Sequence, residues 1–188
     1  MTIFLVRHGE TRLSGTFCGS SNPQLSSLGK NQAAEAAKHL SSFSINSCYS
    51  SPLLRAEQTA DLIWKKRASP IEKHSALREL HFGAWEGLRF EDIQKKWPTL
   101  AAQWIKDPMN VHIPRAESFA SLRKRIRGFI NSISDKLLKQ NVMFVAHGGS
   151  LAAIVLEMLG LPDHHFPKLI APTGSVRMIQ EKQIKTLC

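Results

Sequence analysis

The sequence has few cysteines, no long hydrophobic run and few acidic residues, and each shortage narrows the class of protein. Its three cysteines, Cys18, Cys48 and Cys188, are odd in number and form no CxxC pair, so we expect neither a disulfide framework nor a zinc site. The longest apolar run after the N-terminus, Leu151 to Leu156, is far shorter than the ~20 residues of a membrane span. We therefore expect no signal peptide and no transmembrane helix, and predict a cytoplasmic protein with reduced thiols.

Acidic residues are outnumbered, with 15 Asp and Glu against 25 Lys and Arg and a formal charge of +10. Such an excess fits a nucleic-acid partner, an anionic membrane surface or an enzyme that attracts anionic substrates. The densest cluster, Arg123 to Arg127, lies among apolar residues at helical spacing, and its cations fall outside the apolar arc. We expect a solvated helix face there. Since no nucleic-acid motif accompanies it, we predict no nucleic-acid partner and no membrane partner.

The chain contains ample apolar material for a buried core. With 188 residues, of which 43% are hydrophobic, it is expected to form one domain over residues 1–188. Two short apolar runs, Thr2 to Val6 and Asn141 to Ala146, predict buried strands. A brief extended segment is expected at Ser47 to Tyr49, and closing strands at 175–180 and 183–187.

Helical patterns separate these strands. Helices are predicted over 28–40, from Ser51-Pro52 onward, over 89–105 with an interruption at Pro98, over 118–139, and from residue 151 to a stop at Gly160. A loop is expected over 107–117. The alternation of strands and helices predicts an α/β protein with a largely parallel sheet.

Polar groups stand where several of these strands end. Arg7 and His8 follow the first strand, Arg55 lies in the opening turn of a helix after another, and His147 follows a third. Taken singly, each has an ordinary structural explanation. In such sheets, however, ligands bind outside the carboxyl ends of the strands, so these groups are expected to converge. Two arginines, two histidines and the amides of a glycine-rich helix entry would form a pocket for a phosphoryl group.

A neutral histidine in that pocket is the best available nucleophile. Cations beside it disfavour its protonation, which explains why Arg7 would precede His8 if this imidazole must attack phosphorus. The alkoxide expelled by the attack needs a proton from a general acid. On spacing alone, either Glu79 or Glu86 could supply it, since both lie among aromatic residues that could raise a carboxyl pKa by desolvation.

Four segments, in chain order, resemble the signature elements of the histidine phosphatase superfamily, in the branch that contains the cofactor-dependent phosphoglycerate mutases. They are RHGET at 7–11, SPLLRAEQTA around Arg55, LRELHFGAWEG around Glu79 and AHGG at 146–149. The resemblance implies a three-layer α/β/α sandwich with a mostly parallel central sheet, as in the phosphoglycerate mutases. It also implies that no metal and no cofactor is required.

The resemblance further implies roles for individual residues. His8 corresponds to the nucleophile that becomes phosphorylated, and Arg7, Arg55 and His147 correspond to the phosphate pocket. Glu79, rather than Glu86, corresponds to the proton donor that later activates water.

The same pocket contains a further expected donor and one departure from the family pattern. The Gly148 amide is expected to donate to the phosphate. Ser14 stands where many relatives have asparagine, and its hydroxyl can still donate one hydrogen bond with a shorter reach. A second departure is Ala116, where relatives commonly have glycine before Glu-Ser. It leaves the conformation of that loop open.

Chain length and further resemblances indicate the type of reaction and the class of substrate. Only 67 residues separate Glu79 from His147, fewer than mutases of this branch usually have, which favours an open site and hydrolysis of a small-molecule phosphate monoester. The LRELHFGAWEG segment and the stretch from Trp104 to Ser118 resemble the α-ribazole phosphatases. Broad-specificity and sugar-phosphate phosphatases share these features, and a cofactor-dependent mutase, an isomerase, is the rival from another class. The oligomeric state stays open, a homodimer included.

Overall fold

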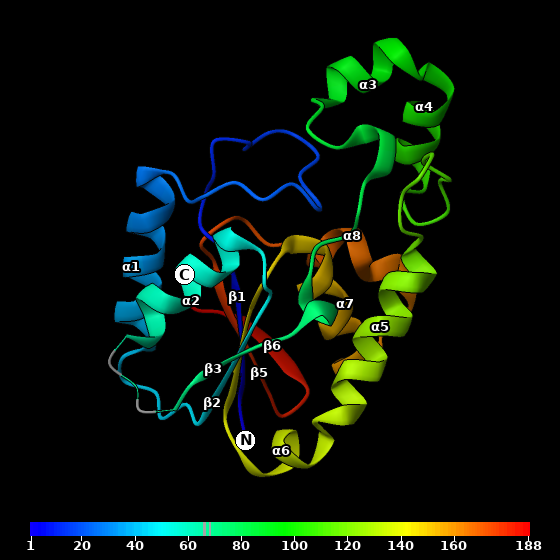
Figure 1. Cartoon of the computed structure of the whole chain (residues 1–188). Helices are drawn as coiled ribbons and strands as arrows, with labels where there is room; N and C mark the ends of the chain where they lie inside the picture. The colour runs from blue at the N-terminus through cyan, green and yellow to red at the C-terminus, as the bar shows by residue number, and fades with distance from the viewer. Residues whose placement is uncertain (66, 68) are drawn as a thin grey trace.

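The computed structural model describes residues 1–65, 67 and 69–188, with a six-stranded sheet between helices (Figure 1). The strand order is β3-β2-β4-β1-β5-β6. Four strands run parallel, namely β1 (Ile3–Arg7), β2 (Ser47–Ser50), β3 (Ile71–Lys73) and β4 (Val142–Ala146). The last two, β5 (Val176–Gln180) and β6 (Gln183–Thr186), pair antiparallel at one edge. The predicted α/β class and mostly parallel sheet are confirmed, while β3 has no counterpart among the predicted strands.

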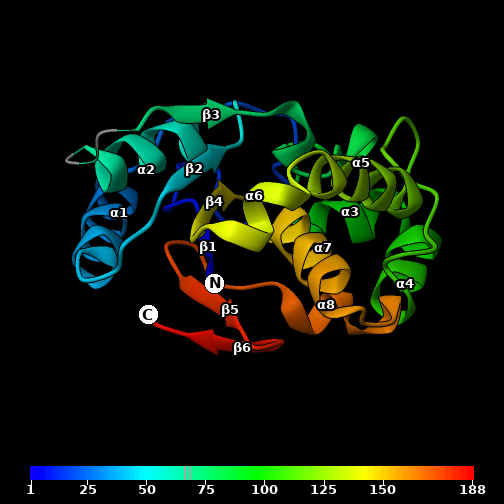
Figure 2. The same cartoon turned by 90° about the horizontal axis from the view of Figure 1, so that it is seen from below.

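Alternating side chains of β1 show why helices cover both faces of the sheet. Phe4 and Val6 pack in one apolar cluster with α1 (Ser27–Leu40) and α2 (Leu54–Trp64). Ile3 and Leu5 point to the other face, into a cluster with α5 (Phe119–Ser132), α6 (Ser134–Lys139) and α7 (Gly148–Leu159). Because successive strand residues face opposite sides, one apolar strand builds two cores. Figure 2 shows the resulting three layers from below.

The helix predicted over 118–139 is in fact two helices, α5 and α6, with Ile133 between them at φ −115° and ψ 14°. The Ser132 hydroxyl donates to the Phe129 carbonyl at 2.7 Å, which is the group that the Ile133 amide would bond in a continuous helix. The Ile133 amide instead bonds the Ile130 carbonyl at 3.3 Å. A serine side chain competing for a helix carbonyl therefore ends α5.

The helix start predicted at Ser51-Pro52 is also wrong, because α2 begins at Leu54. The Ser51 hydroxyl accepts from the Leu53 amide at 3.2 Å and also bonds the His147 ring at 2.8 Å. Ser51 therefore belongs to the turn at the end of β2, and its side chain faces the site described below.

A small cap stands above the carboxyl edge of the parallel strands (Figure 1). It contains α3 (Phe90–Lys96) and α4 (Pro98–Lys106), with the predicted interruption at Pro98 and an irregular segment over 107–117. Its own apolar cluster surrounds the fully buried Trp85. Phe17, from the loop after β1, packs edge-on against Phe82, Trp85 and Trp104 at centroid distances of 5.1–5.6 Å. The loop after β1 and the cap thus share one core.

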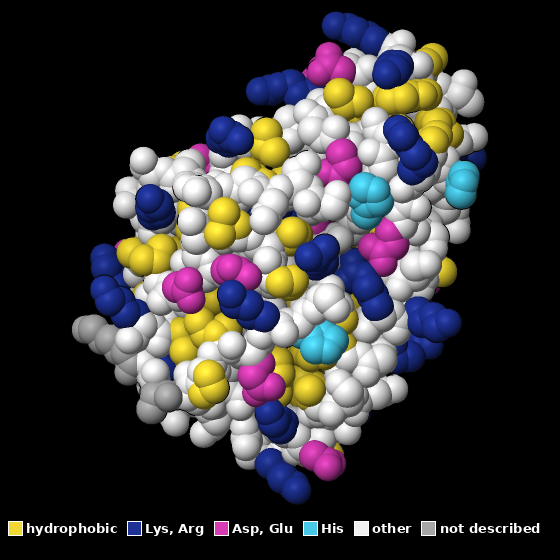
Figure 3. Space-filling model, in the orientation of Figure 1, with side chains coloured by type: hydrophobic (Ala, Val, Ile, Leu, Met, Phe, Trp, Pro, Cys, Tyr) yellow, Lys and Arg dark blue, Asp and Glu magenta, His cyan; other side chains and the backbone are white. Residues whose placement is uncertain are grey.

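The basic residues of α5 correct the expectation of a fully solvated face. Arg123 pairs with Glu157 and Asp163, and Arg125 pairs with Glu117 at 2.7 Å, with only 14% and 23% of the two arginine side chains exposed. On the face drawn in Figure 3, Lys and Arg side chains lie scattered among acidic ones and do not gather in one patch.

Within the described residues, no helix combines the length and apolar character needed to cross a membrane.

Two short helical segments lie between α7 and β5. The 3-10 turn Asp163–His165 leads into α8 (Phe166–Leu169), which packs on α7. A left-handed Gly160, at φ 65°, ends α7 as the sequence predicts. Phe166 and Ile170 thereby face the carboxyl edge of the sheet, where they line the cavity described below.

Candidate active site

The sheet register brings the two histidines to one edge. Arg7 of β1 pairs with Ala146 of β4, so the next residues, His8 and His147, leave the sheet side by side. Their ring centroids lie 5.0 Å apart. Arg55, in the first turn of α2, reaches between them from the neighbouring strand connection. The convergence expected at the carboxyl ends of the strands is therefore present.

The hydrogen bonds of His8 select its tautomer. Its Nδ1 lies 2.7 Å from the Gly9 carbonyl oxygen, which can only accept, so Nδ1 carries the proton and Nε2 keeps its lone pair. Burial lowers the pKa of His8 to about 3, and the positive charges of Arg55 and Arg7 act in the same direction. The imidazole is therefore neutral near pH 7, as the adjacent cations led us to expect, although burial is the larger cause.

Arg55 is fully buried and holds both histidines. Its Nε donates to His8 Nε2 and to His147 Nδ1, at 3.2 Å in each case. Its terminal nitrogens donate to backbone carbonyls of the loop after β1, at 2.6 Å to Ser21 and 2.8 Å to Gly19. Burial lowers the pKa of this guanidinium. Its two terminal nitrogens are therefore engaged by the protein, and Nε is the group directed at the histidines. Arg55 is not among the residues that line the cavity.

His147 occupies the other side of Arg55. Because its Nδ1 accepts from Arg55, its proton lies on Nε2, which donates to the Ser51 hydroxyl at 2.8 Å. Burial holds the pKa of His147 well below its usual value, and nearby positive charge adds to the effect.

Among the described residues, Arg7 is the cation that lines the cavity. Its Nη1 donates to the Ala171 carbonyl, while its buried Nε has no hydrogen-bond partner among the described residues. Burial lowers the pKa of Arg7, and the charge of Glu79 opposes that change. A buried N–H without a partner is costly. Arg7 is among the residues that line the cavity, where its positive charge favours an anion.

Glu79 lies at the N-terminus of α7. Its carboxylate accepts from the amides of Gly149 at 3.0 Å, Ser150 at 3.2 Å and Leu80 at 2.9 Å. Helix N-terminal amides favour a negative group, which explains the placement. Position 149 must be glycine for this contact, since a Cβ there would lie 2.5 Å from Glu79 Oε1.

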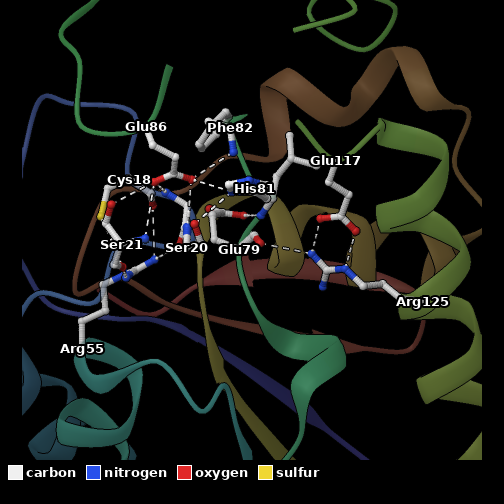
Figure 4. A network of polar contacts seen from close by, with 12 residues as sticks. Cys18, Ser20, Ser21, Arg55, Glu79, His81, Phe82, Glu86, Glu117 and Arg125 are labelled. Carbon is white, nitrogen blue, oxygen red and sulfur yellow. Dashed lines mark hydrogen bonds and ion pairs between the residues drawn. The ribbon is translucent and has the colours of Figure 1, made fainter. Parts of the chain in front are cut away.

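The backbone of Glu79 is held from behind by Arg125. Arg125 donates to the carbonyls of Arg78 at 2.9 Å and Glu79 at 3.2 Å, and its guanidinium pairs with both oxygens of Glu117 (Figure 4). Sequence reasoning placed Arg125 on a solvated face and missed this contact. The apolar periodicity of the helix carries no signal for it.

The structure separates the two candidate carboxylates. Glu79 lines the cavity and Glu86 does not. Burial raises the pKa of Glu86, but hydrogen bonds from the Phe82 and Ser20 amides and from Ser21 outweigh burial and lower it overall. The expectation that aromatic surroundings raise a carboxyl pKa is therefore wrong for Glu86.

The cavity beside His8 has a volume of about 420 Å³. Arg7, Glu79, Gly148 and the exposed Ser14 line it, so the predicted residues Ser14 and Gly148 both reach the space in front of His8. Most of the remaining wall is apolar and includes side chains that sequence reasoning did not place in the site: Leu13, Phe17, Leu80, Phe82, Phe166 and Ile170. Trp104 and Pro108 of the cap complete this wall.

The loop at Ala116 adopts an ordinary conformation at that residue. The left-handed position is Arg115, at φ 61°. The Ala116 amide donates to the Ile113 carbonyl at 3.1 Å. The absence of glycine at 116 therefore causes no backbone strain there.

The buried neutral histidines predict how stability depends on pH. The pKa of His8 is about 3 in the folded chain and 6.5 in the unfolded chain, so between these values the unfolded state binds more protons. The free energy of unfolding should then fall by about 1.4 kcal/mol per pH unit for each such histidine as pH drops below ~6.5. Urea titrations at pH 7, 6 and 5 on wild type and His8→Asn measure this, and the variant should show the shallower decline. Equal slopes for the two proteins would contradict the prediction.

Comparisons with known proteins agree with this geometry. A model of the histidine phosphatase superfamily, branch 1, matches residues 3–186. The α-ribazole phosphatase from Shigella flexneri superposes with a TM-score of 0.86 at 27% identity, over 99% of this chain and 94% of that one.

Two relatives are named for different activities. Phosphoserine phosphatase 1 from Hydrogenobacter thermophilus is 32% identical over 85% of this chain and 76% of its own length. Adenosylcobalamin/alpha-ribazole phosphatase from Escherichia coli is 29% identical over 86% of this chain and 81% of its own. The chain belongs to branch 1 of the histidine phosphatase superfamily. Its fold is that of the phosphoglycerate mutase-like proteins, as the sequence resemblance implied.

Proposed function

We propose that the protein is a phosphomonoesterase that acts through a phosphohistidine. His8 Nε2 attacks the phosphorus atom, and the bond from phosphorus to the ester oxygen breaks with its electron pair on that oxygen. The protonated form of Glu79 donates its proton to the departing alkoxide, which leaves Glu79 as a carboxylate. The Arg7 guanidinium, the Gly148 amide and the Arg55 Nε–H now shared by the histidines stabilise the charge on the other phosphoryl oxygens. Ser14 adds a hydroxyl donor at the rim.

In the second step Glu79, now a carboxylate, takes a proton from water. The resulting hydroxide attacks the phosphoryl group, the bond from phosphorus to Nε2 breaks, and its electron pair returns to His8. The Gly9 carbonyl holds the Nδ1 proton throughout, which stabilises the imidazolium that develops as Nε2 bonds to phosphorus. His147 is held by Ser51 and Arg55, and it keeps Arg55 Nε aimed at the reacting atoms.

For the substrate we propose α-ribazole 5′-phosphate, which would place the protein in assembly of the cobalamin nucleotide loop. The observation that carries this choice is the wall of the cavity. Among the described residues that line it, Arg7 and Glu79 are the only charged side chains beside the neutral His8, and aromatic rings form much of the remainder. A neutral benzimidazole ring suits such a wall.

The same wall disfavours two other substrates. The carboxylate of 3-phosphoglycerate and the second phosphate of a bisphosphorylated mutase cofactor would meet no further cation among the described residues of the cavity lining. The ammonium of phosphoserine would find no carboxylate except Glu79 in the part of the lining that the structure describes. A broad-specificity or sugar-phosphate phosphatase is the second candidate, since an apolar wall without a fixed charge also accepts varied alcohols.

A substrate panel tests both levels of the proposal. Phosphate release is measured with EDTA present for α-ribazole 5′-phosphate, phosphoserine, 3-phosphoglycerate, fructose bisphosphates and p-nitrophenyl phosphate. We expect kcat/KM for α-ribazole 5′-phosphate to exceed the values for the other substrates by about tenfold or more, because a few favourable contacts with the pocket produce a difference of this size. Comparable slow rates would support the generalist instead, and interconversion of phosphoglycerates stimulated by 2,3-bisphosphoglycerate would indicate a mutase.

A further inference from the structure

We propose that Glu86 is a positioning residue for the phosphoryl pocket, and that it acts through Arg55 without touching the substrate. The inference rests on the proposed phosphatase reaction for its main readout. Its physical basis is a continuous set of hydrogen bonds from the cap, through the loop after β1, to the guanidinium between the two histidines (Figure 4).

The first link joins Glu86 to two segments at once. One carboxylate oxygen accepts from the Ser20 amide at 2.9 Å and the Phe82 amide at 3.0 Å. The other accepts from the Gly19 amide at 3.2 Å and the Ser21 hydroxyl at 3.0 Å. Both oxygens are therefore acceptors for N–H or O–H groups, and together they tie the loop after β1 to the base of the cap.

Only an ionised carboxylate satisfies these donors. A glutamine at 86 would replace one accepting oxygen with an NH2 group, which would face N–H donors and lose their hydrogen bonds. The loop after β1 also packs closely against Glu86 and Leu80. A Cβ on Gly19 would lie 2.4 Å from Glu86 Oε1 and 2.1 Å from the Leu80 carbonyl. The loop can therefore not reach this position with a larger residue at 19.

The second link joins this loop to Arg55. The carbonyls of Cys18, Gly19 and Ser21 receive the terminal nitrogens of the guanidinium, at 3.2, 2.8 and 2.6 Å. Glu86 binds the amides of the same segment, so it determines where these carbonyls point. A planar guanidinium anchored at both ends by carbonyls has its Nε direction set by them.

That Nε–H is directed at the reacting atoms, 3.2 Å from His8 Nε2. If the loop relaxes, the guanidinium rotates or shifts, and its N–H no longer meets a phosphoryl oxygen on His8. A displacement of about 1 Å at a positioning group can cost on the order of 10²-fold in rate. Because the phosphoryl group is common to all substrates, the loss should not depend on the leaving group.

A double-mutant cycle tests the link on the full chain. Phenyl phosphate and p-nitrophenyl phosphate are assayed with wild type, Glu86→Gln, Arg55→Ala and the double variant. We expect Glu86→Gln to lower kcat/KM about 10- to 100-fold, by the same factor for both substrates. In the Arg55→Ala background the same change should cost less than about twofold, since residues acting in one network are not additive. Glu91→Gln, an exposed glutamate of α3, should leave the rates unchanged.

Two outcomes would overturn the proposal. Equal losses from Glu86→Gln with and without Arg55 would make its effect independent of Arg55, and a loss seen only with the poor leaving group would assign it to proton donation. Thermal unfolding checks that Glu86→Gln is folded at the assay temperature. Should it unfold, Glu86→Asp, which keeps the charge on a shorter side chain, is put through the same cycle.

Inorganic phosphate provides a readout that separates this inference from the proposed function. If wild type hydrolyses none of the monoesters, the proposed function fails, and the cycle is repeated on the affinity for inorganic phosphate measured by calorimetry. Glu86→Gln should weaken that affinity in wild type and leave it unchanged in Arg55→Ala. Equal affinities in wild type and Glu86→Gln would contradict the positioning role directly.

Discussion

Replacing His8 with alanine should abolish turnover of every phosphate monoester, including those with good leaving groups. Nε2 of His8 carries the lone pair that would bond to phosphorus, because Nδ1 is committed to the Gly9 carbonyl at 2.7 Å. The other imidazole, that of His147, is fully buried and is not among the described residues that line the cavity. His147 is therefore not placed to take over the attack on a phosphorus atom held there, and water alone would lack a covalent path.

The phosphoenzyme can be located chemically. After a rapid alkaline quench with labelled p-nitrophenyl phosphate, trypsin cleavage after Arg7 and Arg12 releases the peptide HGETR, whose only histidine is His8. We expect the label in this peptide for wild type and no label anywhere for His8→Ala. The control His39→Ala, altered at a partly exposed histidine on α1, should behave as wild type. A label on His147 would reverse the roles proposed for the two imidazoles.

Much of the fold could be predicted because its signals are local. The apolar runs of β1 and β4 and the helical pattern of α1 each indicate one element, and alternation of such elements dictates a parallel sheet. The parallel sheet in turn dictates that Arg7, His8 and His147 meet at one edge. The convergence of these side chains was therefore a consequence of topology, and it needed no knowledge of side-chain packing.

What could not be predicted depends on contacts between distant segments. Strand β3 has only three residues, two of them charged, and pairs with the sheet through its backbone, so no apolar pattern marks it. The carbonyls of Gly19 and Ser21 that hold Arg55 have no side-chain signature. Spacing alone could not separate Glu79 from Glu86, because they differ in which backbone amides they meet in the folded chain.

Replacing Glu79 with glutamine should slow the first turnover of phenyl phosphate by about 10²-fold or more, the usual contribution of a general acid. The phenolate is a poor leaving group and needs the proton. With p-nitrophenyl phosphate the leaving anion is stable by itself, so the first turnover should remain near the wild-type rate. Glutamine keeps an oxygen that can accept from the Gly149 or Ser150 amide, which preserves the local fold better than alanine would.

The later turnovers separate the two roles of Glu79. Because the same carboxylate would activate water, hydrolysis of the phosphohistidine should also slow, and p-nitrophenyl phosphate should then give a burst of nitrophenolate equal to the enzyme concentration. Stopped-flow absorbance measures the burst and the steady rate together. Glu86→Gln should give no burst, since misplacing Arg55 slows the first step for both substrates. If the first turnover of phenyl phosphate is unchanged in Glu79→Gln, the general acid is a group other than Glu79. The two esters differ only in whether the leaving group needs a proton, so this comparison isolates proton donation.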